Sequence, residues 1–257
     1  VIIPTGDDVV AVFRATGEKT QIVMNAIEQR TVIPYFQPIR NMVNGKAECH
    51  EVLSRIRTDK GLMDAESFIE VAEQLGVVGK LDNVIMEHAF RKVKEEGYEG
   101  FLFLNLSPKS LIIKDFIPDV LKLTEKFGIA PSTIVFEITE RDTVKNISLL
   151  EKFVHALKAE GFKFAIDDFG SGFSSFHYIK HFPIDFVKIE GEFIVHMAAD
   201  RKNLALVKTM VILAQEFGIQ TVAECVEDEK ILEAVKRLGI NYGQGYHIGS
   251  PSPDLSR

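Results

Sequence analysis

Short apolar runs alternate with helix-like segments over most of this 257-residue chain, and that alternation is the strongest constraint on its fold. A run of four to eight apolar residues is typical of a buried strand, and apolar residues every three or four positions are typical of a helix. Four expected helices stop at a glycine, which is common where a left-handed residue ends a helix. Those ends are Phe127-Gly128, Glu160-Gly161, Phe217-Gly218 and Leu238-Gly239.

The pattern predicts eight strands with helices between most of them. The expected strands are residues 35–39, 47–56, 101–106, 134–139, 162–166, 186–189, 221–226 and 243–248. The expected helices are residues 18–30, 65–75, 78–96, 116–127, 148–160, 174–181, 193–217 and 230–238, and Asp64 is the expected N-cap of the second. The link through Asn44-Gly45 is short enough for a hairpin, so the first two strands should be antiparallel.

This order of elements predicts an α/β fold, a TIM-like (β/α)8 barrel with one antiparallel strand. A doubly wound sheet is the alternative. Residues 1–20 are expected to be an N-terminal extension or the tail of an upstream domain, with a short strand at 9–13. Residues 21–257 are expected to form one domain. Because the chain starts at Val1 rather than Met, we expect it to be part of a longer protein.

Charge and cysteine content exclude several classes of function. A net charge of -7 and a pI of about 5.6 argue against binding duplex DNA or RNA, which needs a basic face. A nucleotide ligand stays open if metals supply positive charge. Two cysteines do not make a disulfide framework, so a cytoplasmic location is expected. The chain has no apolar run of membrane-spanning length, although a parent protein could carry a membrane anchor or a sensor.

One apolar run ends in two adjacent carboxylates and a glycine-rich loop, reading Phe164-Ala165-Ile166-Asp167-Asp168-Phe169-Gly170-Ser171-Gly172. Adjacent carboxylates repel, so one should stay protonated unless a cation holds both. Strand alternation places Asp167 and Asp168 on opposite sides, and only a residue past the strand end can turn back, which the glycines permit. The motif alone leaves two interpretations open. It could supply ligands for two divalent metals, or it could be a solvated turn that caps the next helix.

Nearly every expected strand ends in a polar residue, and barrel enzymes carry their chemistry at the carboxyl ends of their strands. These residues are Glu51, Asn105, Glu137, Asp167, Asp168, Lys188, Glu224 and Gln244. Single members have structural explanations: Asn105 as a turn residue, Lys188 as an ion-pair partner, and Glu137 with Glu140 as exposed side chains. Oxygen donors without ligand-spaced His or Cys favour Mg²⁺ or Mn²⁺ over zinc. The set therefore predicts metal-dependent phosphoester hydrolysis.

From about residue 35 to 253 the sequence resembles the EAL family of cyclic di-GMP phosphodiesterases. The matching stretches are FQPI at 36–39, EVLSR at 51–55, FIEVAEQLG at 68–76, NLSP at 105–108, FEITE at 136–140, AIDDFGSGFSS at 165–175, KIE at 188–190, AECVE at 223–227 and QGYHIGSP at 244–251. The family fold is a barrel with one antiparallel strand, so residues 21–257 are expected to be an EAL phosphodiesterase domain.

The resemblance implies a role for each site residue. Glu51, Asn105, Glu137 and Asp167 would hold a first metal, and Asp167, Asp168 and Glu224 a second. Lys188 would hold the attacking water, and Glu224 is the candidate general base, unless two metals make a strong base unnecessary. Arg55 would bind a phosphate, Gln37, Gln244 and Pro251 would line the guanine and ribose pockets, and Glu140 would hold the loop after Asp168. A metal-activated water would then open cyclic di-GMP to linear pGpG.

The sequence departs from the family pattern without losing a ligand. The signature has Val52 where alanine is usual, and Ser171 stands for threonine. Glu190 stands for aspartate, which places its carboxylate one methylene further out. Cys225 stands for a glycine directly after Glu224, and a side chain there is strained if the backbone has positive φ. We expect an active site whose rate these last two changes could lower.

The resemblance also implies partners. Homologues dimerise near the loop and helix that follow Asp168, so a homodimer is expected, and an upstream sensory or GGDEF-like domain is expected in the parent chain. A weak or inactive cyclic di-GMP receptor is the main alternative to the enzyme. An enolase-like barrel is a third, but it needs paired strand-end lysines or a Lys/His pair, and this chain has one strand-end lysine, Lys188.

Overall fold

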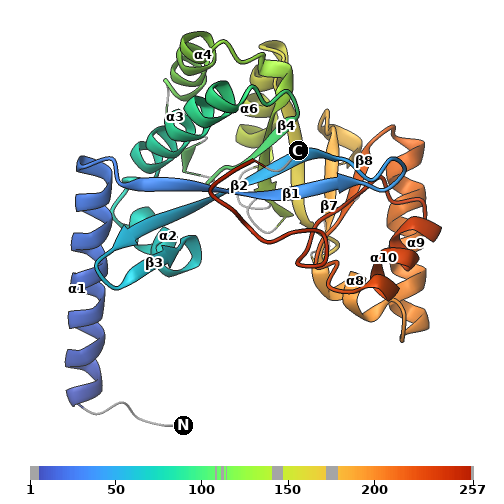
Figure 1. Ribbon diagram of the computed structural model, residues 1–257, viewed down its shortest axis with the longest axis horizontal. Helices are drawn as coiled ribbons and strands as arrows, with labels where there is room; N and C mark the ends of the chain where they lie inside the picture. The colour runs from blue at the N-terminus through green and yellow to red at the C-terminus, as the bar shows by residue number, and fades with distance from the viewer. Residues whose placement is uncertain are drawn as a thin grey trace.

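The computed structural model describes residues 6–107, 109–110, 113, 115–140, 147–171 and 179–255, with side chains described from residue 17 onward. Its centre is a nine-stranded sheet in the order β1-β9-β8-β7-β6-β5-β4-β2-β3. A further pairing between β1 and β2 closes eight of these strands into a barrel, and β3 lies outside the ring (Figure 1). The predicted barrel is confirmed. The doubly wound alternative is wrong because β1 pairs with both β2 and β9, which closes the sheet, whereas a doubly wound sheet is open.

The predicted hairpin forms the antiparallel part of the barrel. β1 (Val32–Asn41) pairs with β2 (Ala47–Thr58), and the register places Gln37 opposite Glu51. Gly45 takes a φ of 72° in the turn, where a left-handed residue costs little only if it is glycine. Since β1 and β2 are joined by a turn, no crossover helix lies between them in sequence. The C-terminal segment instead runs beside β1, through a bridge between Phe36 and Ser252 (Figure 1).

The other ring strands are parallel to β2, and helices pack outside them. The strands are β4 (Phe101–Asn105), β5 (Ile134–Thr139), β6 (Lys163–Phe169), β7 (Phe186–Ile189), β8 (Gln220–Ala223) and β9 (Tyr242–Gly243). The helices are α2 (Ala65–Gln74), α3 (Val78–Glu96), α4 (Phe116–Phe127), α6 (Ile147–Ala159), α8 (Gly191–His196), α9 (Arg201–Glu216) and α10 (Glu229–Arg237), with a short 3-10 turn at Pro131–Thr133. As predicted, α3 and α4 end at glycines in the left-handed conformation.

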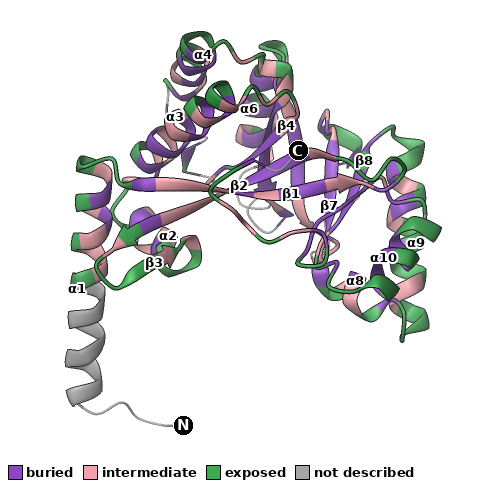
Figure 2. Cartoon of the chain, viewed as in Figure 1, coloured by how far each residue is buried: buried purple, intermediate pink, exposed green. Residues whose placement is uncertain are grey.

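An apolar cluster, called the barrel floor below, fills the barrel interior toward the amino ends of the parallel strands. Its members come one from each ring strand and are Ile39, Cys49, Phe103, Val135, Ala165, Phe186, Val222 and Tyr242. A larger apolar layer lies between the strands and the outer helices, and Figure 2 shows much of the parallel strands as buried, while β1 and β2 include long intermediate stretches. The interior cluster forms a floor, and side chains further along each strand stand above it.

Two predicted elements differ in kind from the structure, one strand was missed, and the strands expected at 221–226 and 243–248 are shorter, at Gln220–Ala223 and Tyr242–Gly243. Residues 9–13 lie inside the helix α1 (Gly6–Glu28) and not in a strand, and in the closed ring they would have no free strand edge to join. The single helix expected at 193–217 is two, α8 and α9, because Asp200 starts a new helix by accepting a hydrogen bond from the Lys202 amide. The short strand β3 (Gly61–Asp64), which pairs with β2, was not predicted. Most of the helix expected at 174–181 lies outside the described residues.

Two further observations concern the helices. Asp64 precedes α2 as predicted, but its side chain does not cap the helix and pairs instead with Arg55. None of the helices in the described ranges is long and apolar enough to cross a membrane. The division of the chain at residue 20 stays a prediction.

Candidate metal centre

Each residue of the barrel floor has a polar residue two positions away on the same strand or just beyond its end. Strand side chains repeat with a period of two, so a polar residue at this spacing points to the same interior. The polar residues are Gln37, Glu51, Asn105, Glu137, Asp167, Lys188, Glu224 and Gln244. The strand-end set predicted from sequence is therefore brought together in space, and Gln37 joins it from the antiparallel strand.

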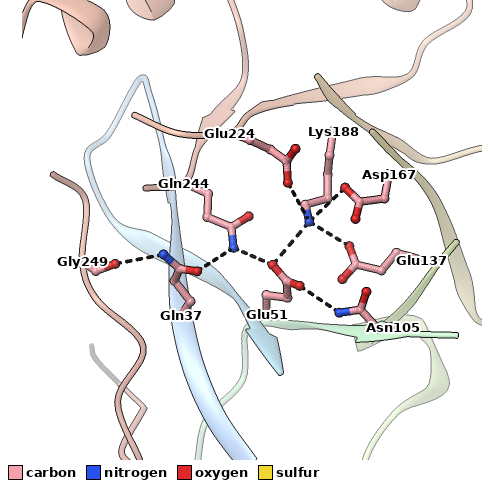
Figure 3. A network of polar contacts seen from close by, with 9 residues as sticks. All are labelled: Gln37, Glu51, Asn105, Glu137, Asp167, Lys188, Glu224, Gln244 and Gly249. Atoms are coloured by element: carbon pink, nitrogen blue, oxygen red, sulfur yellow. Dashed lines mark hydrogen bonds and ion pairs between the residues drawn. The ribbon is translucent and has the colours of Figure 1, made fainter. Parts of the chain in front are cut away.

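The ammonium group of Lys188 stands among four of the carboxylates (Figure 3). Its Nζ lies 3.1 Å from Asp167 and from Glu224, 3.3 Å from Glu51 and 3.4 Å from Glu137. Lys188 is 1% exposed. Although burial alone would lower it, the surrounding carboxylates raise the pKa of Lys188 well above its ordinary value. Lys188 therefore stays charged and partly neutralises the cluster.

Glu51 has the most complete set of hydrogen bonds in the site. Asn105 Nδ2 donates to its Oε1 at 2.8 Å, and Gln244 Nε2 donates to its Oε2 at 2.6 Å. Gln244 Nε2 also donates to Gln37 at 3.2 Å, and Gln37 donates to the Gly249 carbonyl at 3.3 Å (Figure 3). Burial would raise the pKa of Glu51, but Lys188 and the two amide donors outweigh it and hold that pKa below its usual range. Glu51 is a fixed carboxylate.

Glu137 lacks the hydrogen bonds that hold Glu51. It is fully buried, and neither of its oxygens accepts a hydrogen bond. Burial raises the pKa of Glu137 well above its ordinary value, and the charges of Glu51 and Asp167 raise it further against the pull of Lys188. A buried carboxylate without donors costs several kcal/mol, roughly. The position is one that a bound cation would satisfy.

A backbone irregularity lets both adjacent aspartates face the site. The pairing of β6 with β7 shifts register between Ile166 and Phe169, and Asp168 takes a φ of 53°. The two carboxylates therefore approach Glu224, and ligand atoms of Asp167, Asp168 and Glu224 all lie within 4.8 Å of one another. The bend was expected past the strand end, but it lies inside β6, which continues to Phe169. Such a bulge is a common way to re-aim a side chain beside an active site.

The charges and donors of this cluster fit divalent metal ions. Five carboxylates and one ammonium group leave a large excess of negative charge in a partly buried space. Burial, with the charges of Asp167 and Glu51 adding to it against Lys188, raises the pKa of Glu224 to about 8, so cation binding there would release a proton. The donors are all carboxylate or amide oxygens, which suit hard cations of the Mg²⁺ and Mn²⁺ type. Both oxygens of Glu137 and the buried Oδ1 of Asp167 accept no hydrogen bond, so a cation could take them as ligands.

The remaining predicted residues lie around this centre with different degrees of contact. Glu140 accepts a hydrogen bond from the Gly170 amide at 2.9 Å, as expected of a residue that holds the loop after Asp168. Arg55 lies further along β2, where its Nε is 2.6 Å from Asp64 and its guanidinium lies over the Tyr35 ring. Pro251 lies in the C-terminal segment beside Ser252. The structure therefore places Arg55 and Pro251 outside the hydrogen-bonded network.

The two sequence departures near the centre have different surroundings. Cys225 has a φ of 51°, which a side chain adopts at a cost, and it packs closely over Gly191. A Cβ on Gly191 would lie 2.3 Å from the Cys225 sulfur, so the two positions fit only as a large and small pair. Glu190 lies between the end of β7 and the start of α8. The expected strain at Cys225 is confirmed.

A cavity of about 570 Å³ opens beside the strand-end carboxylates and extends between β2 and the helices α2 and α3. Glu51, Asn105 and Asp168 line one end. Glu73, Asp82 and Ser107 line the other, and sequence reasoning did not find them. Acidic residues on an amphipathic helix are ordinary surface residues, so the pattern gave no signal for them. A ligand of nucleotide size fits this volume.

Comparison with known proteins gives a consistent result. A family model described as EAL domain matches residues 20–251. The chain is 35% identical over 236 residues to the cyclic di-GMP phosphodiesterase PdeB of Shewanella oneidensis, covering 90% of this chain and 28% of that protein. It is 33% identical over 239 residues to PdeF of Escherichia coli K12, a cyclic di-GMP phosphodiesterase, covering 90% of this chain and 32% of that protein. The chain thus spans about a third of the length of these curated relatives.

Solved structures agree with the fold. A structure titled PaMucR phosphodiesterase in complex with c-di-GMP is 28% identical, with a TM-score of 0.86, and the match covers 92% of this chain and 98% of that one. The FimX EAL domain of Pseudomonas aeruginosa bound to c-di-GMP has a TM-score of 0.87 at 24% identity, covering 93% of this chain and 98% of that one. At that identity the second match supports the fold alone.

Proposed function

This chain belongs to the EAL domain family, and we propose that it hydrolyses one phosphodiester bond of cyclic di-GMP to give linear pGpG. The observation that carries the proposal is the complete polar ring above the barrel floor, with Lys188 among four carboxylates and Asp168 turned toward Glu224. The catalytic relatives supply the substrate class.

Two divalent cations, Mg²⁺ or Mn²⁺, are part of this proposal. Glu51, Asn105, Glu137 and Asp167 would hold the first, and Asp167, Asp168 and Glu224 the second. Bound there, such ions polarise a phosphodiester and make a bound water more acidic. The fit rests on the buried oxygens of Glu137 and Asp167, which contact Lys188 but accept no hydrogen bond.

The protein's own groups then orient the reaction. Lys188 Nζ lies between Asp167 and Glu224, where it can hold a water by donating a hydrogen bond to it. Glu224 accepts a proton from that water as its oxygen forms a bond to phosphorus. The bond between phosphorus and the 3′ oxygen breaks, and the 3′ oxygen takes up a proton from solvent. The pKa of about 8 for the metal-free Glu224 shows that this carboxylate can carry a proton near neutral pH.

Other residues would bind the substrate. Arg55 offers a guanidinium for a phosphate toward the carboxyl end of β2. The phosphate would either replace Asp64 at the guanidinium or bind the guanidinium nitrogens that Asp64 leaves free. Gln37 and Gln244, linked to each other and to Gly249, would face a guanine or ribose, with Pro251 nearby. Gln244 therefore has two tasks, since it also fixes Glu51.

We also propose the partners named from sequence. A homodimer would form through the loop and helix after Asp168, much of which lies outside the described residues. Gly170 of that loop lies against Met210 of α9 and Phe193. A partner that displaced these two side chains would therefore also displace the backbone beside Asp168. An upstream sensory or GGDEF-like domain and a cytoplasmic location stay predictions.

The direct test is incubation of the purified protein with cyclic di-GMP and Mg²⁺ or Mn²⁺, followed by chromatography. We expect pGpG to accumulate, and Glu51→Gln to abolish it. The alternative function is a cyclic di-GMP receptor. Micromolar binding without any pGpG from the parent protein would favour that receptor and overturn the enzyme.

A further inference from the structure

The outer face of the β1–β2 hairpin carries a groove of about 1180 Å³ that is separate from the metal centre. Most ring strands have a crossover helix on their outer side, but β1 is joined to β2 by a turn. The groove lies where the hairpin turn, the α3–β4 loop and the C-terminal segment meet. Its volume exceeds that of a typical small-molecule pocket, so a ligand would fill part of it.

Strand alternation separates the groove from the active site. Gln37 and Ile39 of β1 face the barrel interior, whereas Phe36, Pro38 and Arg40 line the groove. A ligand in the groove would therefore lie on the opposite side of β1 from the metal-binding carboxylates. The wall between the two sites is shared, because Arg40 donates to the Ile248 carbonyl and Gln37 to the next carbonyl, that of Gly249.

The groove holds two cations without a carboxylate partner. Arg40 makes the one hydrogen bond to Ile248, at 3.3 Å, and its Nε has no acceptor. Neither Arg40 nor Lys46 forms an ion pair within the part of the chain that the structure describes. An arginine that lines a cavity with a spare donor is a typical anion contact.

Three carboxylates also line the groove, and among the described residues none of them lies within ion-pair distance of Arg40 or Lys46. Glu48 accepts hydrogen bonds from Asn41, Asn44 and Tyr242, and those bonds lower its pKa. Asp254 pairs with Lys92 at 2.7 Å. Glu99 is exposed to solvent. The charge of Lys46 lowers the pKa of Glu48 a little further, so Lys46 is partly offset, and the Nε of Arg40 is the donor of the groove that stays without an acceptor.

Apolar and small residues supply the rest of the lining. Pro38 packs so closely on Gly249 that a Cβ there would lie 2.5 Å from the proline ring. Phe101, Tyr98 and Ile248 also line the space. A flat apolar body with an anionic group matches this combination.

We propose that this groove is a second ligand site, which binds a small organic anion, a phosphate or carboxylate carried on a flat ring, through Arg40 and Lys46. The proposal is independent of the hydrolysis reaction. It requires neither metal nor an intact catalytic centre.

The test uses amide NMR spectra of the isotope-labelled protein in EDTA, titrated with GMP, guanosine or benzoate. GMP tests a phosphate and benzoate a carboxylate, while guanosine keeps the ring without the charge. We expect at least one of the two anions to shift the amide signals of Gly45, Gly97, Gly100 and Gly249. Guanosine should leave them in place.

Variants locate the binding. Arg40→Gln should weaken the anion at least ten-fold, and Lys46→Gln, an exposed turn substitution that cannot disturb the core, should weaken it several-fold. Arg57→Gln, an exposed substitution on β2 that does not line the groove, should leave the affinity unchanged. Equal affinity in the wild type and both groove variants would overturn the proposal, and so would shifts confined to the residues around Glu51.

Discussion

The ammonium nitrogen of Lys188 lies 3.1 Å from the Glu224 carboxylate, although the two residues come from neighbouring strands and are 36 positions apart. The same nitrogen contacts three further carboxylates from three other strands. One lysine thus links the ends of five strands. The catalytic centre and the stability of the barrel mouth therefore depend on the same group.

Lys188→Met should destabilise the metal-free protein by about 3 kcal/mol or more, because four carboxylates would lose their only close cation among the described residues. Mg²⁺ or Mn²⁺ should raise the melting temperature of this variant more than that of the wild type. Thermal unfolding with and without metal measures both effects. Lys158→Met, which removes a pair with Asp185 whose side chains are 27% and 18% exposed, is the control and should cost less than Lys188→Met because both charges still reach solvent. Equal melting temperatures for the two variants would contradict the role given to Lys188.

Glu137→Gln and Glu51→Gln should change stability in opposite directions. Glu137 is buried, neither of its oxygens accepts a hydrogen bond, and its ion-pair partner Lys188 is shared with three other carboxylates, so a neutral amide should stabilise the metal-free protein by about 1 kcal/mol. Glu51 accepts from Asn105 and Gln244, and an amide there would leave one donor unpaired, at a cost of about 1–3 kcal/mol. Chemical denaturation of the two variants tests the difference. Both should lose at least about 100-fold in turnover, since each removes a metal ligand. A Glu137→Gln protein less stable than the wild type would contradict this reading of the site.

Cys225→Gly should stabilise the protein by about 0.5–1 kcal/mol, because glycine adopts the φ of 51° without strain. Cys225→Ala is the matched control, since it removes the thiol but keeps the Cβ. The free energy of unfolding should rank the glycine variant above the alanine variant. If alanine were the more stable of the two, the strain would not be what limits this position.

The Asp82 carboxyl should make stability depend on pH. Burial, with the charge of Glu73 adding to it, raises the pKa of Asp82 to about 7, against the hydrogen bond from Ser110. Between pH of about 4 and 7 the unfolded chain loses this proton while the folded protein keeps it. The free energy of unfolding should therefore fall as pH rises, by up to about 1.4 kcal/mol per pH unit from this group.

Denaturation of Asp82→Asn across that range isolates the contribution. The difference in stability between variant and wild type should grow in favour of the variant from pH 4 to 7 and then level off. A constant difference across the range would show that Asp82 keeps an ordinary pKa.

The barrel and most of its site could be predicted from the sequence because both depend on short-range patterns. The bounds of α3, α4, β5 and β7 match those expected from apolar spacing and glycine stops. The polar residues two positions above the floor follow from strand alternation alone, so Glu51, Glu137 and Lys188 could be placed in one interior.

Features that depend on backbone irregularity or on long-range pairing could not be read in the same way. The bulge that turns Asp168 arises from how β6 pairs with β7, and no residue pattern fixes a register shift. Asp64 has the sequence of an N-cap, but its carboxylate pairs with Arg55. The antiparallel pairing of β2 with β3 places these two residues opposite each other. The helix α1 reads locally as a strand, because consecutive valines favour β structure unless tertiary contacts decide otherwise.

The central claim is that the strand-end carboxylates hold two divalent cations that hydrolysis requires. Its most direct test measures Mn²⁺ stoichiometry by calorimetry and pGpG formation on the same metal-depleted preparation. We predict two Mn²⁺ ions per chain in the presence of cyclic di-GMP, turnover that rises with their occupancy, and no turnover in EDTA. A preparation that binds no Mn²⁺, or that forms pGpG at full rate in EDTA, would contradict the account.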